Sequence, residues 1–141
     1  TAAEFGMQQT TFDDTTGLSS KNVSVVTDLA IMFDKILNNE TIAQITQQSR
    51  VIMTGSSGRT YTIDSTDELL GTFVDQPPYD ILGGKTGYLP EAGYGLGTMF
   101  SHEQGGEIIV IVLGAETTEG RFQDVKSLAV WAYKTFGWET L

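Results

Sequence analysis

The feature that most restricts the fold is a run of six consecutive apolar residues, from Ile108 to Leu113. A half-buried strand alternates apolar and polar residues, whereas a continuous apolar run is typical of a strand that is covered on both faces. We therefore expect this segment to be a strand inside a sheet. Two further strand segments precede it, at 80 to 86 and 94 to 101, and glycine-containing turns separate the three. This spacing predicts an antiparallel meander.

Helical patterns surround the expected meander. Apolar residues recur at helical spacing in 23 to 39 and again in 118 to 138, and 40 to 48 is typical of a shorter helix. Residues 51 to 63 contain two short strand segments around the turn sequence GSSG, which predicts a β-hairpin. The expected fold class is therefore α+β, an antiparallel β-meander packed with helices.

The apolar run leaves one question open about the sheet. In a meander the last strand lies at an edge unless another strand pairs with it, and a long apolar edge is a liability that proteins normally cover. The hairpin at 51 to 63 is one candidate for the strand that pairs with this edge. Strands that precede residue 1 are the other candidate.

The composition argues against several classes of function. The 141 residues suit one domain, and a net charge of −10 argues against binding to nucleic-acid phosphates, which needs clustered Lys and Arg. There is no cysteine, which removes thiolate nucleophiles and thiolate metal sites, and the single histidine, His102, argues against a histidine-based metal site. No apolar run is long enough to span a membrane. We expect neither a metal ion nor a nucleic acid as a ligand.

The sequence DILGGKTGYLP, residues 80 to 90, places Lys85, Thr86 and Gly87 next to one another. A phosphate-binding loop needs a glycine at the position of Tyr79 and a helix after the motif, and the segment that follows does not have a helical pattern. In a strand, the three residues instead present a cation, a hydroxyl and a bare backbone side by side. Such a strand suits an extended peptide that ends in a carboxylate. An ordinary strand end with a glycine turn is the alternative.

Several elements around this motif follow a recognisable order. They are Lys85-Thr86-Gly87-Tyr88, then Ala92-Gly93-Tyr94, then the strand from Ile108 to Gly114, and then Arg121. In this order they closely resemble the C-terminal part of the D-alanyl-D-alanine carboxypeptidases, the low-molecular-mass penicillin-binding proteins. Residues 2 to 18 are similar to the family segment that follows its second serine motif. The resemblance covers nearly the whole chain and implies a partial β-lactamase/transpeptidase-like fold.

The resemblance implies a role for each of five residues. Lys85 would face the terminal carboxylate of the substrate and help to activate serine hydroxyls. Thr86 would hydrogen-bond that carboxylate, Gly87 would allow close approach, and the backbone N–H of Tyr88 would donate to the oxyanion. Arg121 would reach back to the carboxylate with its bidentate fork. The alternative for Arg121 is an exposed charge at the start of a helix.

The same resemblance implies the partners and the location of the intact protein. Its partners would be peptidoglycan stem peptides and β-lactams, with no nucleic acid and no cofactor. It would remove the terminal D-alanine from the stem peptide through an acyl-enzyme. Because that substrate lies outside the cytoplasmic membrane, the expected location is extracytoplasmic.

One family motif is absent from this sequence. The S-x-x-K motif carries the nucleophilic serine and its lysine base, and no lysine here has a serine three positions before it. Ser20 to Asn22 has the form S-x-N, but it lies where the family has no active-site serine, so we interpret it as a loop or the start of a helix. Both serine motifs are therefore expected before residue 1. Residues 1 to 141 are then the C-terminal portion of one transpeptidase-like domain, inactive alone, whose strand near Ile108 to Leu113 pairs with the missing part or with a second copy.

Two other functions keep part of this pattern. One is a non-catalytic binding or structural module of the same fold, and the other is a serine β-lactamase, which shares the K-T-G motif. The remaining candidate residues have ordinary structural interpretations. These are a surface position for His102, solvated loop acids at Asp13, Asp14, Glu116 and Glu119, and packing roles for Trp131, Tyr133 and Trp138.

Overall fold

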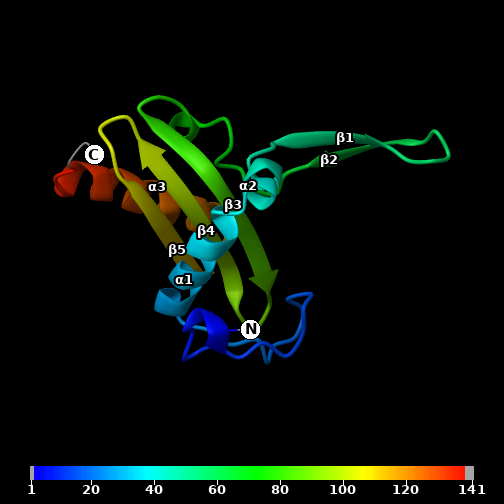
Figure 1. Ribbon diagram of the computed structural model, residues 1–141, viewed down its shortest axis with the longest axis horizontal. Coiled ribbons are helices and arrows are strands. Elements are labelled where there is room, and N and C mark those ends of the chain that lie inside the picture. The colour runs from blue at the N-terminus through cyan, green and yellow to red at the C-terminus, as the bar shows by residue number, and fades with distance from the viewer. Residues whose placement is uncertain (1, 139–141) are drawn as a thin grey trace.

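The computed structural model describes residues 2–138, with a three-stranded antiparallel sheet at its centre (Figure 1). The sheet strands are β3 (Tyr79–Leu89), β4 (Gly93–His102) and β5 (Glu107–Ala115), in that order. The helices are α1 (Val26–Leu37), α2 (Glu40–Thr46) and α3 (Thr118–Thr135), with 3₁₀ turns η1 (Ala3–Phe5) and η2 (Phe73–Asp75). A hairpin of β1 (Arg50–Thr54) and β2 (Thr60–Asp64) forms a separate two-stranded sheet. These elements confirm the expected α+β meander.

The two longest helices cover opposite faces of the sheet, α1 on one side and α3 on the other (Figure 1). Successive residues in the apolar run of β5 point alternately to the two faces of the sheet. Ile108, Val110 and Val112 belong to the core on the α3 side, whereas Ile109 and Ile111 pack against the cluster beneath α1. Because helices cover both faces, no position in the run is polar. The expectation of a strand covered on both faces is confirmed.

Each helix approaches the sheet through one specific contact. The buried Tyr133 of α3 donates its hydroxyl to the carbonyl of Phe100, at 3.0 Å, and that hydroxyl also lies 3.2 Å from the carbonyl oxygen of Gly106. Burial raises the pKa of Tyr133 to about 12, so this donor stays neutral. On the other face, Phe33 of α1 lies over Gly97, where a Cβ would come within 2.3 Å of the ring.

The sheet order places β5 at an edge, and no strand among residues 2–138 pairs with its outer side. The expectation that β5 lies inside a sheet is therefore wrong for the described part of the chain. The hairpin does not fill this position either, since β1 and β2 pair with each other and project away from the body (Figure 1). The physical reason is that an apolar run reports on the cover of a strand's faces. It carries no information about hydrogen bonds along the strand's edges.

Candidate functional site

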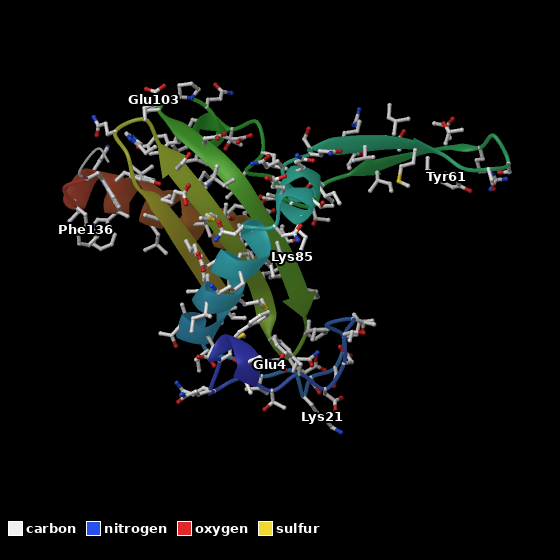
Figure 2. The ribbon with its side chains drawn as sticks, viewed as in Figure 1. Glu4, Lys21, Tyr61, Lys85, Glu103 and Phe136 are labelled. Carbon is white, nitrogen blue, oxygen red and sulfur yellow. The ribbon has the colours of Figure 1, made fainter. Side chains whose placement is uncertain are left out.

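Lys85, Thr86 and Gly87 lie in the second half of β3, the strand at the opposite edge of the sheet from β5 (Figure 2). Within residues 2–138 the outer side of β3 has no strand partner, so side chains satisfy its backbone carbonyls. The Lys85 ammonium donates to the carbonyl of Thr86. The Arg121 Nη1 donates to the carbonyl of Gly87, at 3.2 Å. Lys85 and Arg121 thus donate to two consecutive carbonyls of β3, which point to opposite sides of an extended strand.

Two glycines just before the motif let its neighbours press against β3. Gly83 has a φ of 143°, and a Cβ there would lie 2.6 Å from the Thr46 Oγ1 at the end of α2. A Cβ on Gly84 would lie 2.9 Å from the Asp67 Oδ2 and 3.0 Å from the Gly97 carbonyl oxygen. A larger residue at either position would have to push these groups aside. The two glycines therefore allow α2 and Asp67 to pack closely against β3 beside the motif.

A hollow of about 410 Å³ opens beside Lys85 and Thr86. Its walls come from α2, from the base of the β1–β2 hairpin and from the loop that follows the hairpin. Lys85 is exposed, whereas Thr86 is only 8% exposed. The Oγ1 atoms of Thr66 and Thr86 are 2.6 Å apart, so these two hydroxyls form a hydrogen bond. A cation and an oriented hydroxyl therefore border the same hollow.

Arg121 is buried at the start of α3, with 6% of its surface exposed. Its guanidinium carbon lies 4.7 Å from the centre of the Phe122 ring and 5.4 Å from that of Tyr94, which in turn stacks on Tyr88 at 4.3 Å. These distances are typical of cation–π contacts. The alternative of an exposed charge at a helix start is therefore wrong. The bond to Gly87 holds the motif, and a bond from Arg121 to a substrate carboxylate stays a prediction.

Asp67 is a buried acid beside the motif that the sequence interpretation did not single out. It is 7% exposed, and burial raises the pKa of its carboxyl, although the Leu69 N–H on its Oδ1 and the charge of Arg121 oppose that shift. Its Oδ2 has no hydrogen-bond partner within residues 2–138. The signal available in the sequence was a polar pair, Thr66 and Asp67, placed shortly before two leucines in a segment that fits the family.

The other sequence candidates have structural roles. Ser20 to Asn22 lies in a turn, where the Asn22 side chain accepts from the Asp13 N–H at 2.7 Å, so the loop interpretation is confirmed. Asp14 is half-buried and accepts from the Gly17 N–H at 2.7 Å, and its hydrogen bond with Asn22 lowers its pKa. Glu116 and Glu119 are exposed as expected, Tyr133 and Trp138 pack, and Trp131 is 54% exposed, against the expectation.

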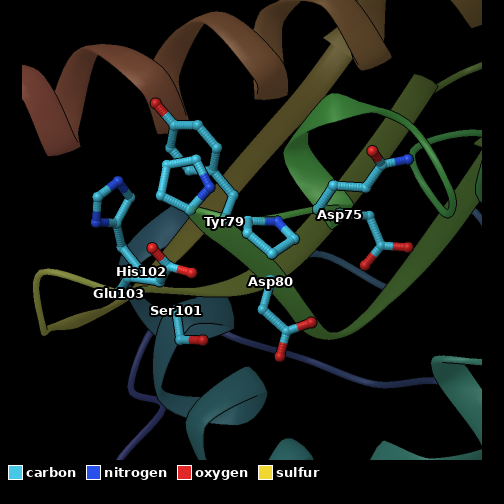
Figure 3. Close-up of a pocket in the computed structure, with 9 residues that line it drawn as sticks. Asp75, Tyr79, Asp80, Ser101, His102 and Glu103 are labelled. Carbon is cyan, nitrogen blue, oxygen red and sulfur yellow. The ribbon is translucent and has the colours of Figure 1, made fainter.

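A second hollow, of about 280 Å³, lies at the far end of β3 around Tyr79 (Figure 3). Asp75, Asp80 and Glu103 line it, and no lysine or arginine does, so its acidic lining disfavours a carboxylate ligand. His102 lines this hollow too, and its ring stacks on Tyr133 at a centroid distance of 4.7 Å. The expected surface position for this histidine is wrong, because it is half-buried among aromatic rings.

Two classes of site receive no support from the described residues. Between residues 2 and 138 no group of three or more His, Cys, Asp or Glu side chains is placed to hold a metal ion. In the same part of the chain, no helix combines the length and the apolar character that crossing a membrane requires.

Comparison with known proteins supports the resemblance. Residues 1–117 match the family model described as D-alanyl-D-alanine carboxypeptidase. A D-alanyl-D-alanine endopeptidase of Haemophilus influenzae is 33% identical over 95 residues, which are 67% of this chain and 31% of that protein. This chain thus spans about a third of that relative.

Solved structures extend the likeness to the fold. A D-alanyl-D-alanine carboxypeptidase from Mycobacterium tuberculosis superimposes with a TM-score of 0.79 at 25% identity, over 96% of this chain and 51% of that one. A Streptomyces DD-transpeptidase gives a TM-score of 0.77 at 22% identity, over 94% of this chain and 51% of that one. This chain therefore corresponds to about half of the length of each solved structure.

Proposed function

This chain belongs to the D-alanyl-D-alanine carboxypeptidase family, and we propose that it supplies the substrate-binding strand of a serine peptidase that removes terminal D-alanine from peptidoglycan stem peptides. One observation carries the proposal. Within residues 2–138, Lys85, Thr86 and Gly87 lie on a sheet edge that pairs with no other strand, beside a hollow that Lys85 and Thr86 line. An unpaired edge with a cation and a hydroxyl suits a peptide that adds to the sheet and ends in a carboxylate.

In the proposed complex the peptide lies along β3. Its carboxylate draws the Lys85 ammonium from the Thr86 carbonyl, and the Thr86 hydroxyl donates to the same carboxylate. Gly87 leaves room for the peptide backbone, and the Tyr88 N–H donates to the oxygen that becomes negative during the reaction. Arg121 is proposed to add a further charge-assisted bond to the carboxylate from its place behind Gly87.

The covalent step needs a serine that this chain does not present in an S-x-x-K motif. In an acyl-enzyme mechanism a serine oxygen attacks the carbonyl carbon of the penultimate D-alanine and the amide bond breaks. The terminal D-alanine leaves with the proton on its nitrogen, and water then hydrolyses the ester. We propose that the nucleophile and its base come from outside these 141 residues, and that the reaction takes place outside the cytoplasmic membrane, where the substrate lies.

A labelled penicillin tests this division of the site. The 141-residue chain is expected to form no covalent adduct, whereas a protein that joins it to a segment with S-x-x-K is expected to be labelled. Covalent labelling of the chain alone would contradict the proposal. No labelling of the joined protein would favour a non-catalytic module, and rapid hydrolysis of penicillin by it would favour a serine β-lactamase.

A second candidate substrate is a cross-linked peptide. The Haemophilus influenzae relative is named as an endopeptidase, and the Arg121 guanidinium is already bound to a carbonyl and two aromatic rings. A site that needs no free carboxylate would accept a peptide that continues past the cleaved bond. Comparing cleavage of linear and cross-linked stem peptides by the joined protein distinguishes the two activities.

The edge of β5 is the second proposed contact. A groove of about 370 Å³ runs beside Ile108 to Ile111, and Val26, Trp131 and Phe136 along it are 48%, 54% and 53% exposed. Exposed apolar groups next to unpaired strand edges favour the addition of another strand. We propose that this strand comes from the rest of the same domain or, in its absence, from a second copy of the chain.

A further inference from the structure

A single peptide group of β3 carries both the carbonyl of Gly87 and the N–H of Tyr88. This peptide group is planar and trans, so its carbonyl and its N–H point in opposite directions. The Arg121 Nη1 donates to the carbonyl at 3.2 Å. The proposed function assigns the N–H on the other side of the same group to the oxyanion. Arg121 is therefore bonded to the very peptide group that presents this donor.

The strands around this peptide group constrain it weakly. Gly87 pairs with Gly95 across the sheet, so the pair has no side chain on either strand. A Cβ on Gly87 would meet no atom of the described residues within 4 Å, and the register between β4 and β5 shifts between Tyr94 and Leu96. Glycine has the widest backbone freedom of all residues. The orientation of the group therefore depends on a contact from outside the three strands.

Arg121 supplies that contact on both sides of the peptide group. Its hydrogen bond holds the Gly87 carbonyl, and its guanidinium carbon lies 5.4 Å from the centre of the Tyr94 ring. The Tyr94 ring stacks on that of Tyr88 at 4.3 Å. One buried side chain at the start of α3 is thus linked to both residues that form the peptide group.

The charge of Arg121 also changes the strength of the N–H donor. A hydrogen bond to a carbonyl polarises the whole peptide group, so its N–H becomes a stronger donor, and a charged donor has a larger effect than a neutral one. The guanidinium has five N–H donors, and the bond to Gly87 uses one of them. The bond that we proposed between Arg121 and the substrate carboxylate is therefore compatible with this second role.

We propose that Arg121 is a positioning residue for the oxyanion site, because its bond to the Gly87 carbonyl orients and strengthens the Tyr88 N–H. This inference rests on the proposed function of the β3 edge, and it adds that Arg121 assists the reaction whether or not the substrate has a free carboxylate. A role limited to the carboxylate would affect only substrates that have one. A purely structural role would change stability and leave the rate of the reaction unaltered.

The first test measures kcat and KM of the protein that joins this chain to a segment with S-x-x-K. Its substrates are two peptides that end in D-alanyl-D-alanine, one with a free carboxylate and one with that carboxylate amidated. Arg121→Met is expected to lower kcat about tenfold for both peptides, less than the hundredfold or more that loss of an oxyanion donor costs. A rise in KM is expected only for the peptide with the free carboxylate. Arg121→Lys keeps a cationic donor and should recover part of the lost kcat.

Tyr133→Phe is the matched control, because Tyr133 lies on the same helix and also donates to a sheet carbonyl, that of Phe100 at 3.0 Å. This variant should lower the melting temperature without lowering kcat. The second readout is the amide nitrogen shift of Tyr88 in the isotope-labelled 141-residue chain, which requires no substrate. This shift responds to hydrogen bonding at the Gly87 carbonyl, so it should change in Arg121→Met and stay constant in Tyr133→Phe.

The outcomes separate this inference from the proposed function. A loss of kcat limited to the peptide with the free carboxylate, or a lower melting temperature with unchanged kcat, would overturn the inference and leave the proposed function intact. An equal fall of kcat in Tyr133→Phe would also overturn it, and so would an unchanged Tyr88 shift in Arg121→Met. Failure of the wild-type joined protein to cleave either peptide would contradict the proposed function itself.

Discussion

The two edges of the central sheet, β3 and β5, are both unpaired within residues 2–138 but differ in chemistry. The β3 edge carries Lys85 and Thr86 next to glycines, and buried polar groups stand behind it at Asp67 and Arg121. The β5 edge is flanked by an apolar groove with an exposed tryptophan. A polar edge suits a ligand that binds reversibly, whereas an apolar edge suits permanent pairing with another strand.

The backbone groups at the β3 edge form hydrogen bonds with side chains. At β3, side chains from two other segments bind the edge: Asp75 accepts from the Ile81 N–H, and Gln47 donates to the Ile81 carbonyl. These polar side chains keep the edge compatible with water, and a peptide that binds at the edge can displace them. The predictions below separate a ligand edge from a strand edge, starting with the largest expected effect.

Gly87→Ala is expected to weaken binding of a D-alanyl-D-alanine peptide more than tenfold, because the methyl group occupies the space of the ligand backbone. A Cβ at Gly87 meets no atom within 4 Å, so the fold should be unaffected. Gly95→Ala is the control, since Gly95 pairs with Gly87 across the sheet and its Cβ would make only ordinary contacts at 3.6 Å. Titration and thermal melts of both variants check this. Unchanged affinity in Gly87→Ala would remove the β3 edge as the ligand site.

Trp131→Glu is expected to weaken self-association of the chain about tenfold, because it replaces apolar surface beside β5 with a charge. Light scattering over a range of concentrations measures the effect. Ile52→Glu, at an exposed apolar position on the hairpin, is the control and should not change the mass. A wild-type chain that stays monomeric at high concentration would count against the assignment of β5 as a strand edge.

Thr66→Val is expected to weaken peptide binding about fivefold, corresponding to about 1 kcal/mol for one hydrogen bond. The hydroxyl of Thr66 orients that of Thr86, and valine keeps the shape without the donor. Thr66→Ser should restore the affinity, since it restores the hydroxyl. Self-association through β5 should be the same in both variants as in the wild-type chain. A change in self-association would contradict the separate roles of the two edges.

The pH dependence of stability should reveal the buried acid behind β3. Burial raises the pKa of Asp67 above its ordinary value of 3.8, so the folded state favours the protonated form. The stability that this group contributes is present below that value and is lost as the pH rises through the raised pKa. Asp67→Asn stays neutral, so its free energy of unfolding relative to the wild-type chain should increase from acidic to neutral pH. Urea titrations measure this, and a constant difference would contradict the raised pKa.

The sequence predicts the ligand edge better than the strand edge, for a physical reason. Lys85, Thr86 and Gly87 are adjacent in the chain, so their chemistry can be recognised without knowing the fold. The contacts of Thr66 and Asp67 with β3 bridge about twenty positions in sequence and depend on how the loop after the hairpin folds back. Likewise, the run at Ile108 to Leu113 predicts two covered faces, but the pairing of an edge is decided by other segments.

The most direct test of the account is a map of backbone amide shifts while a D-alanyl-D-alanine peptide is titrated into the isotope-labelled chain. The account predicts that the shifts concentrate at 84 to 88 on β3 and at Thr66, with no change along β5 between 107 and 115. Shifts along β5, or none at β3 at saturating peptide, would contradict the claim that the Lys85–Gly87 edge is the substrate site.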